Sequence, residues 1–394
     1  MIIGIDARFF GPRGKGLGRY TQKLIESLEK IDQENDYVVF LRRGNFNEFQ
    51  PQNRRFKKIL ADYYWYSFAE QFFLPLKIYR QKIDLMHWPH FNVPIFYFGP
   101  YVVTIHDLIL QHFSTRRASS LGPLKYWFKY LAYKIVIWLA LKRARKIITV
   151  SQYVKKDIIN LFKIKPEKIV VTYEGAPIKN PKSEIPKRDA VPSGLCVRNP
   201  KQSVEKYKID SPFLLYVGNA YPHKNLERLV NAFGILIKDY KQDLQLVLVG
   251  EEDYFYRRLH QDVHLSILYS IESLARIIFT GFVSDEELTA LYQNAKLYVF
   301  PSLCEGFGLP PLEAMSYGVP VVSSNLTCLP EILGEAAIYF NPLDPADMAE
   351  KINQVLMDEN LRENLIAKGF EQIKKYSWRK MAEETLKIYK NTGT

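Results

Sequence analysis

Two glutamates stand eight positions apart in a run of small and apolar residues, CEGFGLPPLEAMSYGVPVV, at residues 304–322. The pattern predicts that Glu305 lies in a loop and that a helix begins near Leu309 and ends at Gly318. Glu313 would lie about one turn inside that helix, whose N-terminal amides can hold an anion between the two acids. Such a site suits a nucleotide sugar, with one carboxylate on the sugar hydroxyls and the other on the ribose. A core role is disfavoured because unpaired buried carboxylates are costly, and a salt-bridged structural pair is the alternative.

A lysine lies near a second expected helix start, in LLYVGNAYPHKNLERLV. The strand in this segment ends at Gly218 and a helix opens near Asn225, so Lys224 adds its charge to the N-terminal end of the helix dipole. This placement predicts a diphosphate site, and a solvated surface lysine is the alternative.

A glycine-rich turn follows the first expected strand, in DARFFGPRGKGLGRYTQKLIESL. Its glycines alternate with basic residues, and the two sets are Gly14, Gly16 and Gly18, and Arg13, Lys15 and Arg19. We expect a helix from Tyr20 to Ile31, and glycines before a helix let backbone amides approach a phosphate or substrate. A flexible surface loop is the alternative, and the spacing lacks the Gly-Lys-Ser/Thr ending of a P-loop.

His106 and Asp107 come where the apolar strand of VVTIHDL ends. Ligands of open α/β sheets bind at the carboxyl ends of strands, where an imidazole can donate a hydrogen bond to a substrate. A structural histidine that binds a loop carbonyl is the alternative.

Apolar strands alternate with helical segments through both halves of the chain, which predicts two α/β domains built on parallel sheets. The pattern breaks between residues 175 and 212, where proline and lysine are frequent. We interpret this stretch as a connection between domains that face each other across a cleft at their strand ends.

Composition narrows the class of protein. A length of 394 residues with 47% hydrophobic content fits two or three globular domains, and three cysteines without paired or metal-type spacing indicate a reducing compartment. The N-terminus lacks the features of a signal peptide, and no uncharged apolar run reaches the ~18–20 residues of a spanning helix. The net charge of +12 suits phosphate-bearing substrates or an anionic membrane, and no sequence pattern supports nucleic acid.

The segment EGFGLPPLEAMSYGVPVV resembles the Glu-x7-Glu signature of the retaining GT-B glycosyltransferases of family four, and GKGLGRYT, TIHDL and VGNAYPHKNL occur in that family's order. The closing AAIYFNPLDPADMAEKI and YSWRKMAEETLKIY are also similar, so the resemblance covers nearly the whole chain. It implies a GT-B fold with two doubly wound, Rossmann-like domains. Its parts would be an acceptor-side domain at 1–175, the connection at 176–212, a nucleotide-sugar-binding domain at 213–376 and a helix at 377–394 that returns to the first domain.

The resemblance also implies roles for the residues singled out above. Glu305 would bind the donor sugar, Glu313 the ribose and Lys224 the diphosphate. His106 would contact the transferred sugar and form the catalytic set with Glu305 and Lys224. The wider donor-binding set is Gly16, Gly18, Asn219, Lys224, Gly306, Phe307, Gly308, Leu309 and Glu313. At Asn219 the chain departs from the family, which often has an arginine there, so the family's second cation on the diphosphate has no counterpart at this position.

The implied activity is retaining transfer of a hexose from a nucleoside-diphosphate sugar to a glycan or lipid-linked glycan. No convincing Asp-x-Asp pair is present to hold a divalent metal, so we expect no metal and no other cofactor. The order GRYT, VTIHDL, VGN and PHKN is more similar to bacterial mannosyltransferases that use GDP-mannose, with UDP-hexoses as the next candidates. A sugar phosphorylase of GT-B architecture and a noncatalytic glycan- or lipid-binding protein are the alternatives.

A basic and aromatic segment, residues 122–146, indicates a further partner. Read as a helix, it places apolar side chains near one face, at Leu124, Trp127, Leu131, Ile135 and Trp138. Aromatic residues beside lysines suit the headgroup boundary of an anionic bilayer, so we expect a cytoplasmic protein bound peripherally at the inner face of the cytoplasmic membrane. Packing against the sheet is the alternative, and a helix with two apolar sides would allow both.

Overall fold

The computed structural model describes residues 1–11, 14–113, 123–176, 206–268 and 276–393. The chain forms two compact units, which we call unit 1 (Met1–Gly175 with Tyr376–Thr394) and unit 2 (Ala176–Lys375). Residues 177–205 of the expected connection lie outside the described part of the chain, as does Arg13 of the glycine-rich turn.

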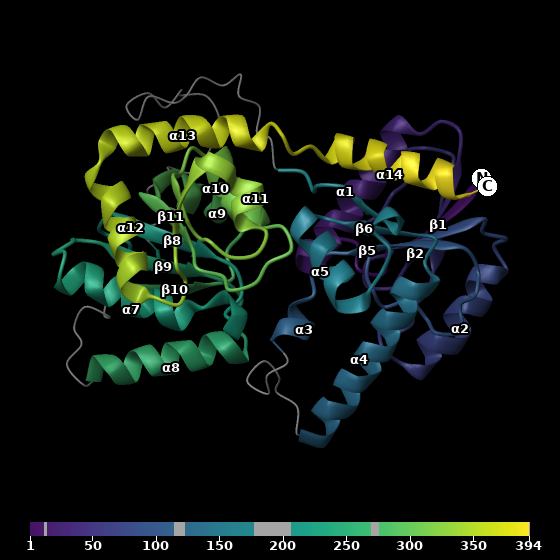
Figure 1. Ribbon diagram of the computed structural model, residues 1–394, viewed down its shortest axis with the longest axis horizontal. Helices are drawn as coiled ribbons and strands as arrows, with labels where there is room; N and C mark the ends of the chain where they lie inside the picture. The colour runs from purple at the N-terminus through teal and green to yellow at the C-terminus, as the bar shows by residue number, and fades with distance from the viewer. Residues whose placement is uncertain (12–13, 114–122, 177–205, 269–275, 394) are drawn as a thin grey trace. The chain divides into compact units, whose positions relative to one another are not determined.

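Within the described residues, unit 1 is built on a parallel sheet of seven strands in the order β3-β2-β1-β4-β5-β6-β7 (Figure 1). Its strands are β1 (Ile2–Asp6), β2 (Asp36–Leu41), β3 (Phe56–Leu60), β4 (Leu85–Trp88), β5 (Tyr101–Ile105), β6 (Lys146–Thr149) and β7 (Ile169–Val171). Its helices are α1 (Lys15–Ile31), α2 (Phe68–Tyr79), α3 (Ile109–His112), α4 (Pro123–Arg143), α5 (Gln152–Phe162), the 3-10 helix η3 (Pro166–Lys168) and α14 (Trp378–Thr392).

Helices cover both faces of this sheet, which is why its strands are apolar on both sides. Ile78 of α2, Leu141 of α4 and Ile158 of α5 are buried in one core cluster. Leu24 of α1 and Tyr389 of α14 are buried in a second cluster on the opposite face. The C-terminal helix α14 therefore belongs to unit 1, where it packs beside α1.

In the described part of unit 2, six strands form a parallel sheet in the order β10-β9-β8-β11-β12-β13. They are β8 (Phe213–Val217), β9 (Gln245–Val249), β10 (Ile277–Gly281), β11 (Leu297–Phe300), β12 (Val321–Ser324) and β13 (Ala337–Phe340). The helices are η4 (Pro222–Lys224), α7 (Leu226–Lys238), α8 (Tyr254–Leu268), α9 (Asp285–Asn294), α10 (Leu309–Ser316), α11 (Leu329–Leu333), η6 (Gly334–Ala336), α12 (Pro345–Met357) and α13 (Glu359–Ile373).

Three elements in the first half of the chain, β3, α2 and α1, differ from the sequence prediction. The sequence does not predict β3 and α2, because FKKIL is a lysine-bearing edge strand and α2 contains Pro75. The helix α1 begins at Lys15 rather than Tyr20, so Gly16 and Gly18 lie in its first turn.

In both sheets the strand order reverses beside the first strand of the unit, between β1 and β4 and between β8 and β11. Connections on the two sides of such a switch point run to opposite faces of the sheet. The loops at the carboxyl ends of the strands therefore diverge and leave room for a ligand. In each unit, we therefore expect a ligand site at the loops that follow these two strands.

Candidate active site

The loop after β8 is held by tyrosines that donate to its carbonyls. Tyr256 Oη donates to the Gly218 carbonyl at 2.9 Å, and Tyr298 Oη donates to the Val217 carbonyl at 3.3 Å. Burial raises the pKa of both tyrosines, so both hydroxyls keep their protons. The chain thus leaves β8 in a defined direction, toward η4 and α7.

Hydrogen bonds join this loop to the loop after β11. Asn225, in the left-handed region at φ 63°, donates through Nδ2 to the Pro301 carbonyl at 3.1 Å. The backbone N of Leu303 donates to the His223 carbonyl at 2.7 Å. Lys224 lies between these two links, so its backbone is fixed relative to the β11 loop.

Lys224 and Glu305 meet across the switch point of unit 2. Lys224 Nζ lies 2.5 Å from Glu305 Oε1, and the two side chains keep 14% and 11% exposure. The same Nζ lies 5.7 Å from the centre of the Phe300 ring, within cation–π range. Two predicted site residues therefore form one charged pair that a ligand can reach. The pairing also fits the alternative in which Glu305 is a structural salt-bridge partner.

Glu313 lies in α10, which begins at Leu309 as the sequence predicts. Gly308 precedes the helix with φ 95°, and a Cβ there would come 2.9 Å from Leu329 Cδ2, so the position requires glycine. Tyr292 Oη donates to Glu313 Oε2 at 3.4 Å. Burial, and then the negative charge of Glu313, raises the pKa of Tyr292, which keeps this donor protonated.

The remaining donor-side residues shape the backbone. Gly306 and Phe307 are buried in the loop before α10. Asn219 Oδ1 accepts from the backbone N of Tyr221 at 3.3 Å and closes the turn after β8. Asn219 thus supplies loop geometry and no charge.

The glycines at the start of α1 in unit 1 differ in their surroundings. Gly18 is buried, and a Cβ there would lie 2.2 Å from the Gly11 carbonyl oxygen, so this glycine lets α1 pack on the loop after β1. Gly16 is exposed, and a Cβ there would meet nothing within 4 Å. Packing explains Gly18, and ligand contact stays a prediction for both.

His106, just after β5, has a partner on each ring nitrogen. Nδ1 lies 2.9 Å from Glu174 Oε1, and Nε2 lies 2.9 Å from the Pro89 carbonyl oxygen. Because a carbonyl oxygen only accepts, Nε2 donates to Pro89. This is the geometry of the structural alternative, and contact with a sugar would require one of these hydrogen bonds to exchange. The substrate role of His106 stays a prediction.

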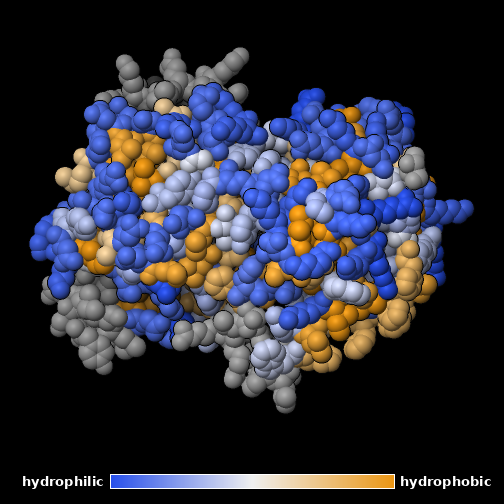
Figure 2. Space-filling view, in the orientation of Figure 1, coloured by the Kyte–Doolittle hydropathy of each residue, from blue (hydrophilic) through white to orange (hydrophobic). Residues whose placement is uncertain are grey.

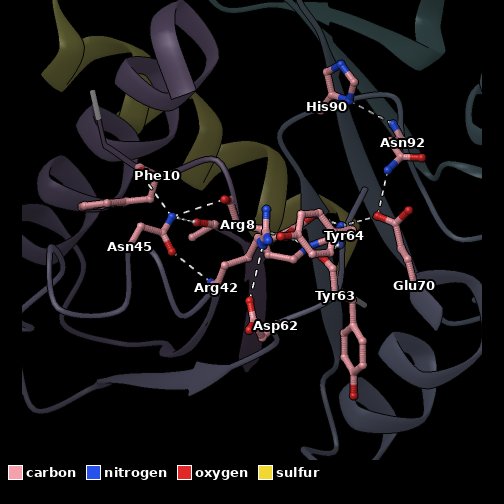
Figure 3. Close-up of polar contacts among 12 residues, drawn as sticks. Arg8, Phe10, Arg42, Asn45, Asp62, Tyr63, Tyr64, Glu70, His90 and Asn92 are labelled. Atoms are coloured by element: carbon pink, nitrogen blue, oxygen red, sulfur yellow. Dashed lines mark hydrogen bonds and ion pairs between the residues drawn. The ribbon is translucent and has the colours of Figure 1, made fainter. Parts of the chain in front are cut away.

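The sequence does not reveal a buried ion network at the switch point of unit 1 (Figure 3). Arg8, just after β1, binds Asp6 through Nε at 2.7 Å and Nη2 at 2.8 Å, and binds Glu70 of α2 at 2.7 Å. Asn92, after β4, donates to Glu70 Oε1 at 2.8 Å. All four side chains are buried. The sequence feature that could have indicated this network is the pair of charged residues, Asp6 and Arg8, at the end of the apolar strand IIGIDAR.

His90, also after β4, is a second residue that sequence reasoning missed. Its Nδ1 accepts from the backbone N of Asn92 at 3.3 Å, which places the ring proton on Nε2. Burial, and then the positive charges of His106 and Arg8, lowers the pKa of His90 to about 3, so the ring is neutral at pH 7. No spacing in WPHFN singles it out. A neutral imidazole that keeps an N–H here can bind a substrate hydroxyl.

The sequence predicts no metal site, no paired cysteines and no membrane-spanning helix. Among the described residues, no group of three or more His, Cys, Asp or Glu side chains is placed to hold a metal ion. Cys304 and Cys328 are buried. The helices in the described ranges include none that is long and apolar enough to cross a bilayer. Metal-independent chemistry stays a prediction.

Comparison with known proteins links the chain to one class of enzyme. Residues 14–179 match the family described as "Glycosyltransferase Family 4", and residues 198–372 match "Glycosyl transferases group 1". The O-antigen chain mannosyltransferase B of Escherichia coli is 30% identical to this chain, over 95% of this chain and 96% of that protein.

Two solved structures share the arrangement at lower identity. Sucrose-phosphate synthase from Thermosynechococcus elongatus has a TM-score of 0.72 and 20% identity, over 99% of this chain and 98% of that one. Anabaena HepE in complex with UDP and glucose has a TM-score of 0.70 and 16% identity, over 99% of both chains. At these identities the likeness shows the fold alone.

Proposed function

Because the chain belongs to the group 1 glycosyl transferases of family four and has the GT-B fold, we propose that it moves mannose from GDP-mannose to a glycan acceptor with retention of configuration. The observation that carries this proposal is the Lys224–Glu305 pair at the switch point of unit 2. A diphosphate would draw Lys224 away and free the Glu305 carboxylate to accept hydrogen bonds from sugar hydroxyls. The pair is thus arranged for exchange with a ligand that carries both groups.

The rest of the donor would lie along α10. Glu313 would bind the ribose, and the N-terminal amides and dipole of α10 would add to Lys224 in stabilising the leaving diphosphate. The acceptor hydroxyl attacks the anomeric carbon on the face from which the phosphate departs, and its proton passes to the departing phosphate oxygen. Neither a metal nor another cofactor takes part.

The names of related proteins support an identity for the donor and the acceptor. The Escherichia coli protein is named for transfer of mannose in an O-antigen chain, which favours mannose and a growing bacterial glycan for this chain. HepE is bound to UDP and glucose, which keeps a UDP-hexose as the alternative donor. His90 and His106 of unit 1 would contact the acceptor and the transferred sugar.

The protein would work in the cytoplasm, bound peripherally at the inner face of the cytoplasmic membrane through α4. This helix has two apolar sides. Ile137 and Leu141 are buried toward the sheet, whereas Trp127 and Trp138 are 57% and 49% exposed. Sheet packing and membrane contact, which the sequence left as alternatives, each have a side of the helix available.

A nucleotide comparison tests the donor. Calorimetric melting with GDP, UDP and ADP should show the largest stabilisation with GDP, because a bound nucleotide stabilises by mass action. Incubation of GDP-mannose with a glycan acceptor should then give a product with the donor's anomeric configuration. Stabilisation by UDP alone would replace mannose with a UDP-hexose. No stabilisation and no donor turnover would favour a noncatalytic binding protein.

A further inference from the structure

Unit 1 exposes a set of large apolar side chains on α2, α4 and the turn between β4 and β5, which we call the aromatic face. Its α2 members, with exposed fractions from 45% to 85%, are Phe68, Phe72, Phe73, Leu76 and Tyr79. Its α4 members, with exposed fractions from 47% to 74%, are Trp127, Phe128, Leu131, Ile135 and Trp138. The turn adds Phe96 at 44% and Phe98 at 70%. Figure 2 shows apolar surface gathered over α2 and α4.

The turn joins the two helices into one surface. Phe96 stacks on Phe72 of α2 with ring centres 4.5 Å apart, and the backbone N of Phe98 donates to Tyr79 Oη at 2.8 Å. On the other side, the guanidinium of Arg143 in α4 lies 5.0 Å from the centre of the Phe98 ring. Phe96 and Phe98 therefore connect the exposed side of α2 with the C-terminal end of α4.

The side chains of the aromatic face are not the ones that pack α2 and α4 on the sheet of unit 1. Leu74 and Ile78 of α2 and Ile137 and Leu141 of α4 are fully buried and already pack both helices on the sheet. Apolar surface left in water costs free energy that burial would recover, and contiguous patches of this kind mark binding surfaces.

The exposed charge on α2 and α4 has one sign. Exposed basic residues on α2 and α4 or next to them are Arg80, Lys129, Lys134, Lys142 and Arg143. By sequence, the only acid in the two helices is Glu70, which is buried against Arg8. Aromatic side chains with lysine and arginine beside them are suited to the headgroup boundary of an anionic bilayer. A protein partner fits less well, because lysine is depleted in protein interfaces.

An apolar groove adjoins the face. It has a volume of about 500 Å³ and runs beside α4, where Ile135, Trp138 and Leu161 line it together with Lys134. An apolar lining with a nearby ammonium suits an acyl chain below a phosphate headgroup.

We propose that α2, the Phe96–Phe98 turn and α4 form a single docking surface for an anionic bilayer, in which α2 contributes as much binding as α4. The inference extends the peripheral contact through α4 to a second helix, and it rests on the proposed function only for the inner-membrane setting. The Glu70–Arg8 ion pair at 2.7 Å holds the first turn of α2 to the loop after β1. The bilayer would thus lie next to the switch point of unit 1, where a lipid-linked acceptor can be received.

Sedimentation with vesicles tests the surface. Phosphatidylcholine vesicles with phosphatidylglycerol should bind the protein at low salt, with less binding at high salt and little to phosphatidylcholine alone. The double variants Phe68→Ser/Phe72→Ser in α2 and Phe128→Ser/Leu131→Ser in α4 should each lower the partition coefficient at least about tenfold. The matched control is Phe282→Ser in unit 2, where the side chain is 81% exposed and the partition coefficient should not change.

Vesicle binding needs neither donor nor acceptor, so its outcome is separate from that of the proposed transfer reaction. Both double variants should keep the wild-type circular dichroism and the wild-type kcat with a soluble glycan acceptor. The proposal is overturned if the α2 variant binds like the wild type, if neutral vesicles bind equally, or if the Phe282→Ser control falls as far. Gel filtration that shows a dimer lost in the α2 variant would make a second copy of the chain the occupant.

Discussion

The two units share a sheet topology but use charge at their switch points in opposite ways. In unit 1, Asp6, Arg8 and Glu70 are buried and bind one another. In unit 2, Lys224 and Glu305 form a pair whose side chains keep 14% and 11% exposure. Removing one member of a fully buried network leaves uncompensated charge, whereas a pair that keeps some exposure can exchange its partner for a ligand. We therefore expect the charges of unit 1 to be structural, and we propose that those of unit 2 bind a ligand.

The pKa values in unit 1 agree with this division. Burial alone would lower the pKa of Arg8, but the charges and hydrogen bonds of Asp6 and Glu70 outweigh it, and the net pKa is raised. Burial raises the pKa of Glu70, and Arg8 offsets part of that rise. Arg8 stays charged at physiological pH and keeps α2 attached to the loop after β1.

Substitution of Arg8 should give the largest effect. Arg8→Met leaves Asp6 and Glu70 buried without their cation, so we expect unit 1 to lose about 3–5 kcal/mol of stability. All five tryptophans lie in unit 1, so urea unfolding followed by tryptophan fluorescence reports on this unit.

Two controls accompany this variant. Addition of Glu70→Gln to Arg8→Met should restore part of the stability, and GDP binding by unit 2 should be unchanged. A loss below about 1 kcal/mol, the size expected of a solvent-exposed ion pair, would show that the Arg8 network is not structural.

Glu305→Gln should give the next largest effect, on turnover rather than stability. If this carboxylate binds the reacting sugar, its loss removes that interaction, and we expect kcat to fall by about 100-fold to 1000-fold. The matched control is Glu335→Gln in the same unit, where the side chain is 88% exposed. Near-normal turnover by Glu305→Gln with its true donor and acceptor would mean that this acid is structural.

Acidification should weaken unit 1 through His87. This side chain is fully buried, with Nδ1 2.5 Å from Tyr389 Oη of α14 and Nε2 2.8 Å from Thr104 Oγ1. Burial, and then the positive charge of His106, lowers the pKa of His87 from 6.5 to about 3. The unfolded chain takes up the proton first, so this stability is complete above pH 6.5 and is lost as pH falls toward 3. The loss by pH 5 is about 2 kcal/mol.

The His87 prediction is checked by urea midpoints from tryptophan fluorescence at pH 7 and pH 5. His87→Gln should flatten the pH dependence of unit 1 by the amount stated. An equal pH dependence in wild type and variant would assign the acid sensitivity to other groups, such as His90.

Removal of divalent cations should leave the transfer activity unchanged. If Lys224 and the amides of α10 neutralise the leaving group in unit 2, transfer should survive excess EDTA. Complete loss of activity that magnesium or manganese restores would mean that unit 2 relies on a metal and not on its own charged pair.

The sequence predicted unit 2 better than unit 1 because its signals there are local. Its six strands are short apolar runs, and Glu305 and the start of α10 lie within one continuous segment. Lys224 is placed by the strand and helix on either side of it. Each of these features depends on residues close by in the sequence, so hydrophobic periodicity and glycine positions are sufficient to predict it.

In unit 1 the decisive contacts join distant segments. Arg8 binds Glu70 on α2, a helix that is hard to predict from the sequence because it contains Pro75. His106 contacts Glu174 and Pro89, which follow other strands. The apolar outer side of α4 is visible as periodicity, but its continuation onto α2 depends on a turn whose packing no spacing reveals.

Titration calorimetry with GDP and GDP-mannose tests the donor site most directly. Lys224→Ala should weaken both ligands at least about tenfold, because it removes a charge-assisted contact with the diphosphate. Glu305→Gln should leave GDP binding unchanged and weaken GDP-mannose, because this acid would touch only the sugar. If Lys224→Ala binds GDP as tightly as the wild type does, the Lys224–Glu305 pair is structural and the donor does not bind where we place it.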